Sequence, residues 1–111
     1  GAGVEYELYR LPAGGGEPEK LTSGGGIMPG LHPGGKLVAY RNPRGDSGIY
    51  VLDLAAQSAR RVLPDDARGM FFHPHFSPDG TKLLVSRLSL TPARQRARGG
   101  FTSNIYVYQW E

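Results

Sequence analysis

Two stretches of this sequence repeat each other at a displacement of 45 positions. Residues 29–37 read PGLHPGGKL and residues 74–83 read PHFSPDGTKL; in both, a proline precedes an apolar residue, a second proline and a glycine. A second motif, an aliphatic residue beside a tyrosine, occurs at residues 8–9, 49–50 and 105–106. Self-similarity at a period of forty-odd residues restricts the fold to stacked units that bury their faces against one another.

The spacing of the second motif locates an insertion. Its three copies lie 41 and then 56 residues apart, so the second interval holds about a dozen additional residues. We place this insertion at residues 89–102.

The repeating units are predicted to be β-sheets. Gly (17) and Pro (9) interrupt almost every window in which a helix would need an uninterrupted period of 3.6 residues. Turn signals such as Pro78, Asp79 and Gly80 separate runs that alternate between apolar and polar residues. These runs predict nine strands, at residues 6–11, 20–22, 27–31, 37–41, 49–54, 60–63, 71–76, 83–87 and 104–110.

Four strands in forty-odd residues are typical of one blade of a β-propeller, in which each four-stranded sheet hides its faces against its neighbours. With the strands of a blade lettered A to D, residues 1–26 supply strands C and D of a first blade. Residues 27–66 form a complete blade, and residues 67–111 form strands A to C of a further blade with the inserted loop 89–102. The predicted fold class is therefore all-β, an incomplete ring of roughly two blades made of antiparallel sheets.

The repeat resembles that of TolB-type propellers. Residues 75–86 (HFSPDGTKLLVS) and 103–108 (SNIYVY) match a unit whose strand A ends in Ser-Pro-Asp-Gly and whose strand C carries Ile-Tyr. The middle copy, residues 29–63, is similar but has His32 and Gly34 where the family has Ser and Asp. His32 is expected to be a turn residue that donates a hydrogen bond to the backbone.

The resemblance implies that the ring must be completed from outside. TolB-like propellers usually have six blades and are often periplasmic, so an extracytoplasmic location is expected by resemblance alone. Either the chain is a fragment of a longer polypeptide, or several copies form a homo-oligomeric ring. Three copies of two blades each would give six, although the first strand C is then surplus.

Composition excludes several classes of protein. The absence of cysteine excludes a disulfide framework, a thiolate metal site and a cysteine nucleophile. A charge of +3, from 13 Lys and Arg against 10 Asp and Glu, is too balanced for a dedicated nucleic-acid binder. Apolar runs are too short for membrane insertion.

The insertion carries the candidate partner-binding residues. Arg94, Arg96 and Arg98 alternate within it, Arg87 precedes it and Phe101 follows. Guanidinium groups bind carboxylates and phosphates bidentately, so this loop predicts a carboxylate-rich protein or peptide partner, or a phosphate. The alternative is a solvated loop whose charges only keep the chain soluble.

His73 and His75 form a second candidate cluster. Residues two apart on a strand share a face, so two imidazoles could bind zinc if Asp65 or Asp66 supplied a further ligand. The alternative, which we favour, is a pair of hydrogen-bonded, metal-free side chains, one of them facing the tunnel of the propeller. No metal or cofactor is expected.

The sequence offers no active site. No serine lies in a Gly-x-Ser-x-Gly turn, and no glycine-rich loop leads from a strand into a helix. Asp53 and Asp79 are expected to hold turns. The chain is therefore interpreted as a non-catalytic propeller segment that serves as a protein-interaction scaffold. The alternative is the gating propeller of a prolyl-oligopeptidase-like peptidase, and a purely structural piece is a third interpretation.

Overall fold

The computed structural model describes residues 6–66, 69–89 and 102–110, and these residues form nine strands and no helix. The first sheet pairs β1 (Tyr9–Arg10) with β2 (Glu19–Lys20). The second sheet contains β3 (Ile27–Leu31), β4 (Leu37–Asn42), β5 (Gly48–Asp53) and β6 (Ser58–Pro64). The third sheet contains β7 (Gly69–Phe76), β8 (Lys82–Ser89) and β9 (Thr102–Gln109).

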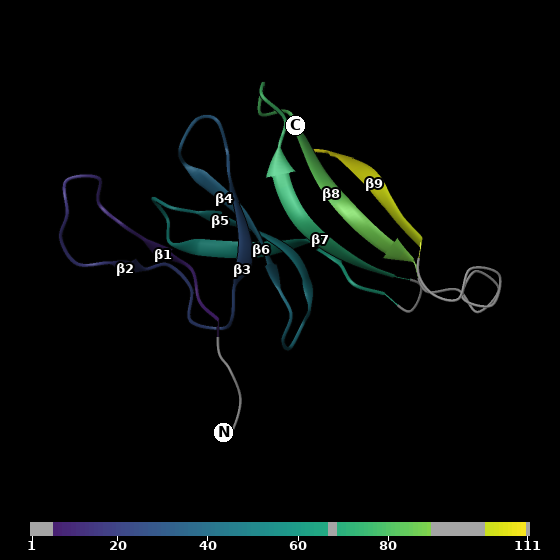
Figure 1. Cartoon of the computed structure of the whole chain (residues 1–111), viewed down its shortest axis with the longest axis horizontal. Coiled ribbons are helices and arrows are strands. Elements are labelled where there is room, and N and C mark those ends of the chain that lie inside the picture. Colours follow the sequence, from purple (N-terminus) through teal and green to yellow (C-terminus); the bar gives the residue numbers. More distant parts are fainter. Residues whose placement is uncertain (1–5, 67–68, 90–101, 111) are drawn as a thin grey trace.

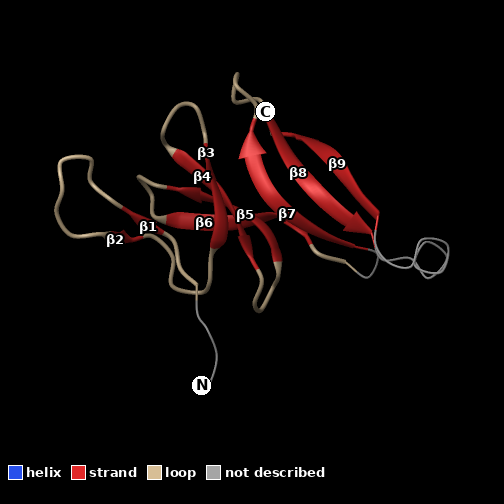
Figure 2. Cartoon of the chain, viewed as in Figure 1, coloured by secondary structure: helices blue, strands red, loops and turns tan. Residues whose placement is uncertain are grey.

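Each strand within a sheet pairs antiparallel with the next strand of the chain. The second sheet lies between the first and the third (Figure 1), and the described connections between strands are loops and turns (Figure 2). This arrangement confirms the predicted fold class, an all-β incomplete propeller. No helix that could span a membrane is found in the described part of the chain.

The second sheet is buried on both faces because successive side chains of a strand point to opposite sides. Toward the third sheet it presents Ala39, Ile49, Val51 and Leu63, which pack against Phe71, Phe76, Leu83 and Val85. Toward the first sheet it presents Val38, Tyr40 and Leu52, which pack against Leu8. β4 and β5 thus contribute side chains to two separate hydrophobic cores.

The sequence repeat is a structural repeat with the same displacement. The His32 amide donates to the Leu37 carbonyl at 2.9 Å, and the Ser77 amide donates to the Lys82 carbonyl at 2.8 Å, which closes two hairpins of equal length. Both first strands also carry a β-bulge before these turns. The offset of 45 therefore equates Val38 with Leu83.

Two aspartates hold turns, as the sequence predicted. Asp53 Oδ1 accepts hydrogen bonds at 3.0 Å from the amides of Ala55 and Ala56. Asp79 Oδ1 accepts from Ser77 Oγ at 2.6 Å and from the Thr81 amide at 3.0 Å. These hydrogen bonds keep the pKa of Asp79 below its ordinary value.

The first two strands are shorter than predicted. Residues 6–11 and 20–22 were expected to pair, whereas the ladder covers only Tyr9–Arg10 and Glu19–Lys20. The Leu8 amide instead donates to the Thr22 hydroxyl at 2.9 Å, so a side chain replaces the backbone partner there. The assignment of residues 1–26, 27–66 and 67–111 to parts of three blades stays a prediction.

Candidate functional site

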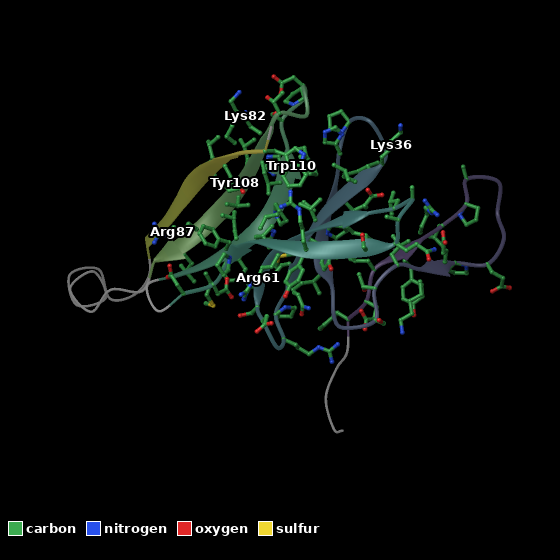
Figure 3. All side chains as sticks on the ribbon, turned by 180° about the vertical axis from the view of Figure 1, so that it is seen from behind. Lys36, Arg61, Lys82, Arg87, Tyr108 and Trp110 are labelled. Carbon is green, nitrogen blue, oxygen red and sulfur yellow. The ribbon has the colours of Figure 1, made fainter. Side chains whose placement is uncertain are left out.

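Arg87 lies near the end of β8, opposite Phe71 of β7 in the strand register. Its guanidinium carbon is 5.9 Å from the centre of the Phe71 ring. Its Nε is buried and has no hydrogen-bond partner among the residues that the structure describes. Figure 3 shows Arg87 at the end of the third sheet where the connection to β9 begins, with Lys82 and Trp110 at the opposite end.

Arg41, from the neighbouring sheet, in contrast has acceptors for both of its Nη groups. It is the one buried charged residue of the described chain, at 4% exposure. Its Nη1 and Nη2 bind both carboxylate oxygens of Asp65, at 3.0 and 2.7 Å, and Nη1 also donates to the Phe71 carbonyl at 2.6 Å. Its guanidinium lies 4.6 Å from the centre of the Phe72 ring. Each of the adjacent residues Phe71 and Phe72 therefore lies under an arginine, and within the described residues Arg41 is the one of the two arginines that binds a carboxylate.

The environment of Asp65 fixes its charge. Partial burial alone would raise the pKa of Asp65, but hydrogen bonds from Arg41 and the Phe71 amide outweigh burial and lower the pKa below 3.8. Both of its carboxylate oxygens bind Arg41, so the structure engages Asp65 in an ion pair and not with His73 or His75. Asp65 instead ties β4 to the start of the third sheet.

The other residues of the predicted partner site cannot be added to Arg87. Arg94, Arg96, Arg98 and Phe101 lie outside the described residues. Their contribution to a common surface with Arg87 stays a prediction.

His73 and His75 are both exposed. They do not follow simple alternation, because the β-bulge of β7 lies between Phe72 and His75 and His73 has a φ of 52°. His75 Nδ1 is 3.4 Å from the His73 carbonyl oxygen. Within the described residues, no three His, Asp or Glu side chains are grouped as a metal site would require.

An open groove lies between the first and second sheets. It has a volume of about 650 Å³. Met28, Leu31 and Val38 line it from the second sheet, and Leu8 and Leu21 line it from the side of the first sheet. The groove exists because the first sheet has only two strands and covers only part of the second.

Comparison with solved structures identifies the architecture. This chain is similar to a putative TolB from Agrobacterium tumefaciens, with a TM-score of 0.70 and 24% identity over 95% of this chain. It is also similar to TolB from Acinetobacter baumannii, with a TM-score of 0.71 and 23% identity over 96% of this chain. The chain has the fold of TolB-type propeller blades.

The TolB-type match is partial in length. This chain covers 34% of the Agrobacterium tumefaciens chain and 24% of the Acinetobacter baumannii chain. No family model matches the sequence, and no curated protein matches it either. The comparisons therefore establish the architecture of the blades.

Sequence reasoning missed the Arg41–Asp65 pair. A signal for it exists: Arg41 lies two residues after Ala39 in an apolar strand, on the face that meets the third sheet. A charge on such a face needs a carboxylate nearby, and Asp65 follows the last strand of the same sheet. The two residues meet only because the pairing of the strands brings Asp65 next to Arg41.

Proposed function

We propose that this chain is a non-catalytic propeller segment that acts as a protein-interaction scaffold. Its partner is a carboxylate-rich protein or peptide, which binds at Arg87 and at the arginines of the following connection, Arg94, Arg96 and Arg98, with Phe101 as an apolar contact. The missing blades come from further copies of the chain or from an adjoining part of a longer polypeptide. By resemblance to TolB, the location is extracytoplasmic.

The observation that carries this proposal is the contrast between Arg87 and Arg41. Both guanidinium groups lie over a phenylalanine ring of β7, at 5.9 and 4.6 Å. Arg41 binds the carboxylate of Asp65, while the buried Nε of Arg87 has no acceptor among the described residues. A buried donor without an acceptor costs about 1–3 kcal/mol, so a partner carboxylate that reached the Arg87 guanidinium would be stabilised by it.

Two carboxylates of the described chain, Asp65 and Asp79, are already bound elsewhere. Asp65 is held by Arg41, and Asp79 is held in its turn by Ser77 and Thr81. An arginine at the end of a strand, followed by three further arginines within twelve residues, favours an acidic partner over a neutral one.

A peptide-binding experiment tests the proposal. Short fluorescent peptides rich in Asp and Glu, and matched peptides with Asn and Gln, are titrated with the chain while anisotropy is measured. The acidic peptides should bind and the amide peptides should not. Arg87→Gln and the triple variant R94A/R96A/R98A should each weaken binding about tenfold or more, since a hydrogen bond to a charged group contributes about 1.5–3 kcal/mol.

Lys82→Gln is the matched control, because Lys82 lies at the opposite end of β8 and its loss removes the same charge. It should change binding by less than about twofold at physiological salt. Equal binding of acidic and amide peptides, or full binding by both arginine variants, would show that the site is assigned wrongly.

A further inference from the structure

Equivalent residues of the second and third sheets differ sharply in exposure. Ile105 and Val107 of β9 correspond to Ile49 and Val51 of β5, because each pair occupies the same register relative to the preceding strand. Ile49 and Val51 are 0% and 4% exposed, whereas Ile105 and Val107 are 69% and 54% exposed. We call the surface formed by Leu84, Ile105 and Val107 the end face. It has the chemistry of a buried face but no sheet upon it.

The groove between the first and second sheets also exposes a residue whose equivalent in the third sheet is buried. Leu31 of β3 corresponds to Phe76 of β7 at the repeat offset of 45. Phe76 is 7% exposed because the second sheet covers it, whereas Leu31 is 62% exposed and lines the open groove. Within the chain, a face of the end-face type packs against a face of the groove type between the second and third sheets. The chain therefore presents one unused copy of each half of an interface that it already makes internally.

The two ends also carry opposite charge. Among the described residues, 6–26, next to the groove, contain three acidic and two basic side chains. Residues 69–89 and 102–110, which contain the end face, have two basic side chains and one acidic side chain. Opposite charge at the two ends favours a head-to-tail contact and disfavours the contact of two like ends.

The groove is bounded by β1, a strand of only two residues. Leu8 is the aliphatic residue of the first copy of the repeated motif, and it lies directly before β1. Its equivalents in the other two copies are Ile49 of β5 and Ile105 of β9. In one copy, Leu8 is 6% exposed and covers part of the second sheet. β9 is an eight-residue strand at the edge of the third sheet, so its outer edge can pair with β2 while its side chains cover more of the second sheet than the two residues of β1 do.

We propose that the chain self-associates head to tail: the end face of one copy docks in the groove of a second copy, and β9 replaces β1 beside β2. The second copy is the occupant because it carries the matching face and the opposite charge. This inference rests on the proposed function, in which the missing blades are supplied from outside a single copy.

An engineered disulfide tests the strand exchange. Tyr9 and Lys20 are direct partners across β1 and β2, within the range that a disulfide spans, and the chain has no other cysteine. Oxidised Y9C/K20C should remain a monomer by sedimentation velocity, whereas its reduced form and the unmodified chain should form species at multiples of 12.0 kDa. Association of the oxidised variant to the same extent as the reduced one, or a monomeric unmodified chain at every concentration, would overturn the proposal.

Lys82→Cys with Gln109→Cys is the matched disulfide control. These residues are direct partners across β8 and β9, a pair that the proposed assembly keeps intact. Its oxidised form should associate like the unmodified chain. Loss of association in this control as well would show that oxidation acts in some other way, and the exchange of β1 would be rejected.

A mixing experiment tests the head-to-tail geometry. Ile105→Glu alters the end face and Leu31→Glu alters the groove; both side chains are largely exposed in one copy, so folding should be retained. Each variant alone should associate at least about tenfold more weakly, because an unpaired charge would be buried. Their equimolar mixture should form a one-to-one dimer through the intact halves. Leu11→Glu, at a position 71% exposed and outside both surfaces, is the control and should associate normally.

The outcomes separate this inference from the proposed function. If Leu31→Glu alone still dimerised like the unmodified chain, the contact would be end face to end face and the head-to-tail inference would be wrong. Acidic peptide binding is tested at Arg87, which belongs neither to the end face nor to the groove, so it does not depend on this result. Its failure would remove the proposed partner site without affecting the oligomer experiments.

Discussion

The imidazole of His32 joins the turn of the second sheet to the turn of the third. His32 Nδ1 accepts a hydrogen bond from the Gly34 amide at 3.0 Å, so the proton is on Nε2, which donates to the Gly80 carbonyl at 3.1 Å. The ring also meets Phe76 edge to face at 4.8 Å between centres. The expected backbone donation by His32 is therefore confirmed, and its acceptor belongs to the next sheet.

Replacing His32 should loosen this junction. His32→Ala removes the hydrogen bond to Gly80 and the ring contact with Phe76, and we expect the free energy of unfolding to fall by about 1–2 kcal/mol. Urea denaturation followed by Trp110 fluorescence measures the loss. Lys36→Ala, in the same hairpin but exposed, should change stability by less than about 0.5 kcal/mol. Equal effects of both substitutions would contradict a specific role of the imidazole.

β3 and β7, the first strands of the second and third sheets, approach each other closely at Gly30. A Cβ at Gly30 would overlap the Pro74 carbonyl oxygen, which is closer than any ordinary contact. Gly30→Ala should therefore push β3 and β7 apart and lower the free energy of unfolding by about 1–3 kcal/mol, as overpacking does. Gly14→Ala is the control, since nothing lies within 4 Å of a Cβ there. Thermal unfolding of the two variants, compared with the unmodified chain, decides whether the contact constrains the sheets.

The Arg41–Asp65 pair should make stability depend on pH. Because the pKa of Asp65 is lowered in the folded chain, the pair stabilises the fold fully above about pH 4 and loses this contribution as pH falls through the folded-state pKa. Asp65→Asn should cost about 3 kcal/mol at neutral pH, since Arg41 keeps its buried charge without a carboxylate. The variant should also lose less stability than the unmodified chain between neutral and acidic pH.

The matched control for Asp65→Asn is Glu19→Gln, which removes a carboxylate from the exposed ion pair with Arg10. Exposed ion pairs contribute about 0–1 kcal/mol, so its effect should be small. Denaturation midpoints measured at several pH values report both variants. A pH profile of Asp65→Asn that is identical to that of the unmodified chain would show that Asp65 does not titrate with folding.

The sequence could predict the features that are local in the chain. The turn at residues 78–80, the carboxylate caps of Asp53 and Asp79 and the presence of nine strands all follow from residues close together in sequence, and each is confirmed. The Arg41–Asp65 pair was missed because its partners are 24 residues apart and meet only through the registration of the strands. The histidines were misjudged as simple alternating neighbours because a bulge in β7 shifts the alternation at His73.

The β-bulges of β3 and β7 each contain a residue with a positive φ. Met28 and His73 are 45 residues apart and have φ values of 56° and 52°, a left-handed conformation that costs an L-residue about 1–2 kcal/mol. His73→Gly removes that strain but frees the unfolded chain, so we expect a net gain in stability of about 0.5 kcal/mol. His75→Gly, two residues further along the same strand and without a positive φ, should instead destabilise the chain by about 0.5–1 kcal/mol. A higher midpoint of thermal unfolding for His73→Gly and a lower one for His75→Gly would support backbone strain at the bulge. A loss of stability in both variants would contradict it.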